Sequence, residues 1–297
     1  MMKRAVTFTK HHTPNSVRVV ARRVMSASHN ARLQLAVPVE TRSEYENIFH
    51  CTIRKTASQW IKSLLSDPIV YRYSGLLPHD PRPHKWRYPQ ALPRDRVVSS
   101  LFVSHKAFMT IPKPERYRAI FILRDPRDIV VSGYFSYRNT HTAMGDIMEV
   151  RSALREKTFK DGLLHVIQYL QDKGTFRALR SWATAPPTDA VRLFRYEDLT
   201  GERQAEEVDQ MMRHCGISIP PSELAALLSR YSFSRMRGGG EAVASVSHYR
   251  KGAAGDWRNH FDDDIYEVFA ETTGNLVELL GYPARDSSPS AERAQDS

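Results

Sequence analysis

Short, nearly continuous apolar runs recur along the middle of the chain, separated by stretches with the spacing of amphipathic helices. The apolar runs predict strands at 47–53, 96–103, 117–123 and 190–195. The other stretches predict helices at 58–66, 127–137, 162–182, 202–215, 221–230 and 263–280. Strands that alternate with helices favour an α/β fold, in which a doubly wound parallel sheet of about five strands is flanked by helices in a single domain.

The two ends of the chain differ from this pattern. Residues 1–44 are basic, rich in Arg, Lys, His and Ser, and only weakly periodic, which predicts a partly ordered or disordered extension. The alternative is a basic amphipathic segment over 17–37 that contacts a membrane or a partner. Residues 284–297 are small and polar, which is typical of a frayed tail, so the folded domain is expected at 45–283.

Composition narrows the class of partner. The 43 Lys and Arg residues exceed the 33 Asp and Glu residues by 10, which indicates an anionic partner: nucleic acid, a lipid surface or a phosphorylated small ligand. A hydrophobic fraction of 41% excludes disorder as the dominant state. The two cysteines, Cys51 and Cys215, are too few for a disulfide framework. With no membrane-spanning run and no signal-peptide pattern, we expect a cytoplasmic protein without stable membrane insertion.

Ligands of parallel α/β sheets bind beyond the carboxyl ends of the strands. After the first predicted strand, the chain enters a helix through the loop 54–60, in which Lys55, Thr56 and Ser58 can donate hydrogen bonds to a phosphate. Amide groups at a helix start attract anions, and the lysine and hydroxyls add donors. The loop lacks the G-x-x-x-x-G-K-[ST] pattern, and the alternative is a capped helix beside a surface lysine.

The second and third strands are also followed by candidate site residues. His105 follows the second strand, where an imidazole suits general-base work, although a structural role is the alternative. Arg124 ends the third strand, and Ser132 lies about two turns into the next helix. An arginine there can bind a phosphate in bidentate fashion. The alternative is an Arg–Asp surface network of Asp125, Arg127 and Asp128.

Three later segments contain further candidate site residues. Tyr196-Glu197-Asp198 follows the fourth strand, and 231–236 leads to three glycines at 238–240. In the stretch 249–261, the basic residues Arg250 and Lys251 follow Tyr249. A glycine-rich loop that ends in positive charge suits a lid over an anionic ligand, and an ordinary disordered connection is the alternative.

In this order, the motifs resemble those of the cytosolic-type sulfotransferases that use 3′-phosphoadenosine 5′-phosphosulfate (PAPS). The resemblance covers 47–283. The loop 54–60 is similar to the family's 5′-phosphosulfate loop, 121–132 to its 3′-phosphate motif and 196–198 to its Y-E-D. The stretch 250–261 matches R-K-G-x-x-G-D-W-x-N-x-F almost completely. The resemblance implies a P-loop-like fold.

It also implies transfer of a sulfuryl group from PAPS to a hydroxyl or amine of a small-molecule acceptor, with PAP as product and no metal. By resemblance, Lys55 stabilises the leaving phosphate and His105 is the general base. The adenine is expected between Trp60 and Phe233. The resemblance assigns further cofactor contacts to Arg54, Thr56, Ala57, Ser58, Gln59, Arg124, Ser132, Tyr196, Ser232, Met236, Arg250, Lys251 and Gly252.

The chain departs from the family pattern at four positions. Arg54 replaces the proline before the lysine, Ala57 the loop glycine, Gln59 the second threonine, and Val103 a lysine. Ala57 predicts that the loop needs no positive φ at that position. The C-terminal dimerisation pattern of animal members is not evident, so the sequence does not specify an oligomeric state.

The sequence specifies the acceptor and its binding pocket less than any other part of the expected site. The pocket is expected to include aromatic residues that would equally suit ordinary loop packing: Tyr71, Tyr73, Trp86, Tyr88 and Tyr134. Three rival functions stay open: a sulfotransferase fold that binds nucleotide without transfer, a P-loop kinase, and a nucleic-acid-binding module. Interleaved aromatic residues on a basic sheet face are missing, so we expect no nucleic-acid partner.

Overall fold

The computed structural model describes residues 15–81, 88–141, 145–232, 235 and 254–285, with side chains from residue 24 onward. Six residues with expected roles lie outside the described part of the chain: Trp86, Phe233, Met236, Arg250, Lys251 and Gly252.

One parallel sheet organises the molecule, and its strand order is β2-β3-β1-β4-β5. The strands are β1 (Asn47–Thr52), β2 (Leu77–His79), β3 (Arg96–Phe102), β4 (Tyr117–Leu123) and β5 (Val191–Arg195). The α/β prediction is confirmed, and the four predicted strands are right to within one residue at each end. The edge strand β2 was not predicted, because its three residues are too few for a hydrophobic pattern and include Pro78.

Helices connect the strands and cover the sheet. They are α1 (Asn15–Ala36), α2 (Ser58–Leu65), α3 (Pro68–Arg72), α4 (His105–Met109), α5 (Pro126–Phe135), α6 (Ile147–Glu156), α7 (Phe159–Asp172), α8 (Thr175–Ala183), α9 (Tyr196–Thr200), α10 (Gln204–His214), α11 (Pro221–Arg230), α14 (Asp263–Thr273) and α15 (Leu276–Leu279). A π-helical turn, η1 (Ser136–Thr140), follows α5, and a 3₁₀ turn, η2 (Asp256–Asn259), precedes α14.

Two of the predicted helices are each divided into two helices in the structure, so the predictions of single helices are wrong. The prediction at 162–182 covers α7 and α8, which Gly174 separates with φ 69°. The prediction at 263–280 covers α14 and α15, with Gly274 between them at φ 58°. Both glycines adopt positive φ, which ends a right-handed helix although the apolar periodicity continues.

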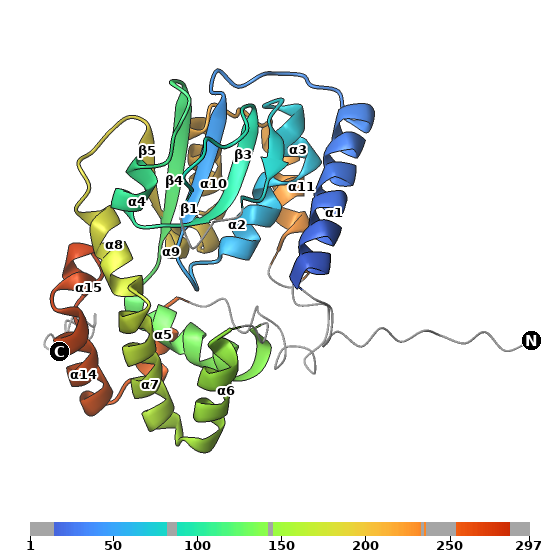
Figure 1. Cartoon of the computed structure of the whole chain (residues 1–297). Coiled ribbons are helices and arrows are strands. Elements are labelled where there is room, and N and C mark those ends of the chain that lie inside the picture. Colours follow the sequence, from blue (N-terminus) through green and yellow to red (C-terminus); the bar gives the residue numbers. More distant parts are fainter. Residues whose placement is uncertain (1–14, 82–87, 142–144, 233–234, 236–253, 286–297) are drawn as a thin grey trace, which may run out of the picture.

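The strands bury both faces of the sheet. On β1, Phe49 and Cys51 belong to a core cluster with Trp182 of α8, whereas Ile48 belongs to a second cluster with Met211 of α10. We call these sides the α8 face and the α10 face. In Figure 1, α10 lies behind the sheet and α8 beside its front, while α5, α6 and α7 lie below the carboxyl ends of the strands. The loops after β1, β3 and β4 therefore open toward this lower layer.

The basic extension contains the helix α1. Its Leu33 is 3% exposed and packs with Tyr71 and Leu77, and the Asn30 side chain donates to the Pro78 carbonyl (3.2 Å). Figure 1 shows α1 beside the β2 edge of the sheet. No helix in the described residues is long and apolar enough to span a membrane. Contact of this segment with a membrane or partner stays a prediction.

Candidate active site

The loop between β1 and α2 has a tightly curled backbone. Lys55 (φ 70°) and Ala57 (φ 58°, ψ 28°) are both left-handed. The Thr56 hydroxyl lies 2.8 Å from that of Thr52 and donates to the Ile53 carbonyl (3.1 Å). The expectation that Ala57 needs no positive φ is therefore wrong. The hydrogen bonds of Thr56 hold the loop in this conformation although a Cβ makes a left-handed backbone unfavourable.

This loop leads directly into an uncapped helix N-terminus. Ala57 occupies the N-cap of α2 and provides no side-chain hydrogen bond to the first turn. Ser58 is buried there and Gln59 is exposed. The first amides of a helix lack intrahelical partners, and the helix dipole makes this end positive. The start of α2 can therefore receive an anion.

Two cations meet at the loop. Arg124, at the end of β4, donates from Nη1 to the Lys55 carbonyl (3.0 Å), and its guanidinium carbon lies 4.4 Å from the centroid of the Tyr196 ring. Burial, together with the positive charge of Arg124, lowers the pKa of Lys55 to about 7. Among the described residues, neither cation pairs with a carboxylate, and Asp125 pairs with Arg127 instead. Such a pair of cations favours an anionic ligand.

His105 is positioned by the start of α4. Its backbone amide donates to the Ser181 hydroxyl (3.0 Å), and its ring meets that of Trp182 edge-on at 5.1 Å between centroids. The Trp182 indole in turn donates to the Val103 carbonyl (2.9 Å). Burial and, secondarily, the charge of Lys113 lower the pKa of His105. The imidazole is therefore neutral near pH 7 and able to accept a proton.

The residues expected near an adenine lie on the α10 face. Trp60 is 7% exposed, and its indole donates to the Tyr231 carbonyl (3.0 Å), one residue before Ser232. Trp60 and Tyr196 belong to the same core cluster. The structure thus brings Trp60, Tyr196 and the start of the 231–236 segment to one side of the loop. Ser132 is half-buried on α5, two turns after the end of β4.

The aromatic residues expected around the acceptor do not form one group. Tyr71 packs with Leu33 of α1. Tyr73 belongs to the α10-face cluster, and its hydroxyl donates to Glu223 Oε1 (2.6 Å). Tyr88 and Tyr134 instead belong to the α8-face cluster, which includes Trp182 beside His105. The structure therefore places Tyr71 and Tyr73 in clusters other than the one beside His105, and their expected part in the acceptor pocket stays a prediction.

Arg54 points toward the α8 face. Its Nη1 donates to the Tyr169 hydroxyl (2.9 Å), which donates to Asp146 Oδ2 (3.2 Å). The Asp146 carboxylate also pairs with Lys173 (2.5 Å). The arginine that replaces the expected proline thus lies on the same side of the sheet as His105. The sequence analysis missed Tyr169 and Asp146, since no local motif marks residues so distant along the chain.

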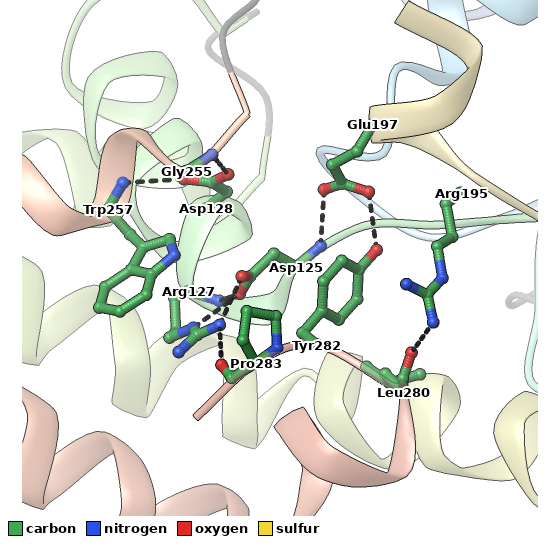
Figure 2. A network of polar contacts seen from close by, with 10 residues as sticks. All are labelled: Asp125, Arg127, Asp128, Arg195, Glu197, Gly255, Trp257, Leu280, Tyr282 and Pro283. Carbon is green, nitrogen blue, oxygen red and sulfur yellow. Dashed lines mark hydrogen bonds and ion pairs between the residues drawn. The ribbon is translucent and has the colours of Figure 1, made fainter. Parts of the chain in front are cut away.

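The Arg–Asp network after β4 is buried rather than on the surface. Asp125 caps α5 by accepting from the Arg127 amide (2.9 Å), and its Oδ2 accepts from Arg127 Nη2 (2.7 Å). The Arg127 side chain is fully buried. Figure 2 shows Glu197 bonded to the Asp125 amide, and Asp128 nearby, bonded to the amides of Gly255 and Trp257. No group of three or more His, Cys, Asp or Glu residues in the described chain is arranged to hold a metal.

Comparison with known proteins identifies the family. The model of the sulfotransferase domain matches residues 46–281, which is most of the chain. The chain belongs to the sulfotransferase family. The matched region begins at the start of β1 and includes the Lys55 loop, His105 and Arg124.

Sequence relatives within the family are distant. Human sulfotransferase 2A1 is 25% identical over 198 residues, which cover 61% of this chain and 66% of that protein. A flavonol sulfotransferase-like protein of Flaveria bidentis is 23% identical over 262 residues, covering 76% and 80%. The chain thus spans slightly less than two thirds of the human relative.

A solved structure shows the same fold. The crystal structure of mouse sulfotransferase SULT7A1 complexed with PAP aligns with a TM-score of 0.56 and 19% identity, covering 89% of this chain and 91% of the mouse chain. The likeness extends over nearly the whole chain and supports the fold rather than individual contacts.

Proposed function

We propose that this sulfotransferase-family protein moves a sulfuryl group from PAPS to a hydroxyl or amine of a small-molecule acceptor. The observation that carries the proposal is the pair Lys55 and Arg124, joined by a 3.0 Å hydrogen bond at an uncapped helix start and unpaired with any described carboxylate. Family membership and the PAP complex of the mouse protein support it.

The residues present suit this cofactor. The amides at the start of α2 and the Lys55 ammonium would hold the 5′-phosphosulfate, and Arg124 with Ser132 would hold the 3′-phosphate. Trp60 and Tyr196, which share the α10 face, would lie on the adenine side. When bound, PAPS supplies the sulfuryl group and a phosphate leaving group.

Lys55 and His105 then have separate tasks. Lys55 neutralises negative charge on the leaving phosphate, and the nearby anion restores the protonated ammonium that burial disfavours. His105 accepts the proton of the acceptor, for which its lowered pKa keeps the ring neutral. Trp60 belongs to the α10-face cluster, whereas His105 contacts Trp182 of the α8-face cluster. Because His105 is the proposed base, the acceptor approaches from the α8 face.

A thermal shift with PAP tests the cofactor site. We expect saturating PAP to raise the melting temperature of the wild type, since a ligand at a hundred times its Kd adds about 2.7 kcal/mol. Arg124→Ala should lose this rise, whereas Arg116→Ala, which removes an exposed arginine, should keep it. A response to ATP and Mg²⁺ without one to PAP would contradict the proposal and favour a kinase.

Transfer is tested separately from binding. With a panel of phenolic, sugar and steroid acceptors, His105→Gln should abolish turnover and leave the PAP shift near that of the wild type. Turnover unchanged in that variant would remove His105 as the base. A normal PAP shift with no transfer to any acceptor in the wild type would favour nucleotide binding without catalysis.

A further inference from the structure

The first turn of α9 lies beside Arg124, because β4 and β5 pair in parallel register. Leu123 pairs with Arg195, so Arg124 and Tyr196 are the residues that follow the same paired position. The Arg124 guanidinium carbon lies 4.4 Å from the centroid of the Tyr196 ring. Tyr196 is 6% exposed and belongs to the α10-face cluster, so packing holds its ring in place. The guanidinium therefore lies against a fixed aromatic surface.

The next residue of α9, Glu197, holds the backbone of the same arginine. Its Oε1 accepts from the Asp125 amide (3.0 Å), and that N–H belongs to the peptide unit that joins Arg124 to Asp125. Asp125 is the N-cap of α5, so its amide has no intrahelical partner and needs one from elsewhere. Tyr196 and Glu197 thus contact the two ends of Arg124, the guanidinium and the main chain.

A residue from the far end of the domain fixes the Glu197 carboxylate. The Tyr282 hydroxyl donates to Glu197 Oε2 (2.7 Å), and the Arg195 guanidinium lies 5.0 Å from the centroid of the Tyr282 ring. Arg195 also donates from Nη2 to the Leu280 carbonyl (3.0 Å). Figure 2 shows the carboxylate between the Asp125 amide and the Tyr282 hydroxyl, with one oxygen for each. Glu197 is therefore itself held in one orientation.

The side chain of Arg124 has one further contact among the described residues. Its Nη1 donates to the Lys55 carbonyl (3.0 Å), whereas its Nε is buried and has no partner in the described part of the chain. A guanidinium recognises a phosphate through a rigid, planar set of donors, so its value for recognition depends on a fixed orientation. The Lys55 carbonyl, the Tyr196 ring and the bond from Glu197 to the main chain together set that orientation.

We propose that Glu197 is a positioning residue for recognition of the 3′-phosphate. By holding the Arg124–Asp125 peptide, it fixes the point at which the arginine side chain leaves the end of β4 and directs the guanidinium along the Tyr196 ring. Glu197 acts on the ligand only through Arg124. The inference rests on the proposed function, in which Arg124 binds that phosphate.

The test compares PAP with 5′-AMP, which lacks the 3′-phosphate. Glu197→Met keeps the length of the side chain but removes both acceptor oxygens. We expect this variant to lose about ten-fold in affinity for PAP, the factor that corresponds to one hydrogen bond to a charged group, with little change for 5′-AMP. Glu197→Gln keeps an oxygen for the Asp125 amide and should stay within about three-fold of the wild type for PAP. Titration calorimetry measures both ligands.

Glu223 provides the matched control. Like Glu197, it is a half-buried glutamate that accepts from a tyrosine hydroxyl, in its case that of Tyr73 (2.6 Å). It lies in the first turn of α11, and no contact among the described residues joins it to Arg124. Glu223→Met should therefore leave the ratio of PAP to 5′-AMP affinity at the wild-type value.

Each outcome decides the question. Equal loss of PAP and 5′-AMP affinity in Glu197→Met, or no loss of either, would show that Glu197 serves the fold alone and overturn the inference. Glu197→Gln as weak for PAP as Glu197→Met would also overturn it, because the glutamine keeps the acceptor. A wild type that binds 5′-AMP no worse than PAP would instead overturn the proposed function.

A milder variant replaces Glu197→Met if that protein does not fold. Tyr282→Phe removes only the donor to Glu197 Oε2 and leaves the bond to the Asp125 amide. It should lower PAP affinity about three-fold, as when one neutral hydrogen bond is lost, and leave 5′-AMP affinity unchanged. An equal effect on both ligands, including no effect on either, would overturn the inference.

Discussion

The ionisation of Lys55 is the most informative property at the scale of single residues. Its backbone carbonyl accepts a hydrogen bond from Arg124, and burial and the charge of that arginine lower the pKa of Lys55 to about 7. A bound anion would oppose both effects and raise the pKa of Lys55, since it adds negative charge beside the buried ammonium. We therefore expect the protonation of Lys55 to be coupled to the binding of a phosphorylated ligand.

We expect PAP binding at pH 8 to take up nearly one proton. Free Lys55 is mostly neutral at that pH and becomes charged in the complex, so PAP affinity falls as pH rises above about 7. The phosphates, with second pKa values near 6, are already ionised. Calorimetry in two buffers of different ionisation enthalpy measures the uptake. Lys55→Arg stays charged and should bind without it, and a wild type with no uptake would contradict the prediction.

Ala57 carries a strain that a single substitution can release. At φ 58° its Cβ crowds the following carbonyl, at a cost of roughly 1 kcal/mol or more. After the higher chain entropy of unfolded glycine is subtracted, we expect Ala57→Gly to raise the free energy of unfolding by about 0.5–1 kcal/mol. Denaturant unfolding measures it.

The control for this substitution lies in a regular helix. Ala225 is exposed in the interior of α11, where glycine has no strain to relieve. Ala225→Gly should therefore lower the free energy of unfolding by about 1 kcal/mol. Destabilisation of similar size by both substitutions would mean that the loop at 57 is not strained.

At the scale of elements, two glycines set how α5 approaches α7. A Cβ on Gly162 of α7 would lie 2.4 Å from Cε2 of Tyr134 in α5. A Cβ on Gly133 of α5 would lie 3.1 Å from Cε2 of Tyr137 in η1 and 3.2 Å from Cγ1 of Val166 in α7. Both aromatic rings are buried in the α8-face cluster, so neither can move into water. The two helices can pack this closely only because these positions lack side chains.

The two glycines should respond differently to alanine. Gly162→Ala forces the Tyr134 ring aside, and we expect it to lower the free energy of unfolding by about 1–3 kcal/mol in spite of better helix propensity. Gly133→Ala meets a milder contact and should cost less. Thermal and denaturant unfolding rank the pair, and a more stable Gly162→Ala would contradict the packing described.

At the scale of the whole molecule, the N-terminal helix is separate from the active-site layer. Leu33 of α1 packs with Tyr71 and Leu77 in a small cluster at the β2 edge, apart from both main cores. The sheet places Lys55, His105 and Arg124 after the carboxyl ends of β1, β3 and β4, whereas Asn30 and Leu33 of α1 contact the β2 edge.

Removal of residues 1–36 should therefore leave the cofactor site intact. We expect the truncated chain to lose roughly 2 kcal/mol of stability, about the value of burying one leucine, and to bind PAP as tightly as the full chain. Titration calorimetry and urea unfolding of both chains test this. A large loss of PAP affinity would instead assign α1 a part in the site.

The sequence by itself determined the α/β class and the positions of Lys55, His105 and Arg124. Apolar strands carry a local pattern, and the ends of parallel strands share one edge, so residues after each strand could be placed together. The tertiary structure alone decided the curled backbone at Ala57, the separation of Tyr73 from Tyr134, and the bonds from Asp128 to Gly255. These three features depend on which faces and which distant segments come into contact when the chain folds, and the local hydrophobic pattern does not specify those contacts.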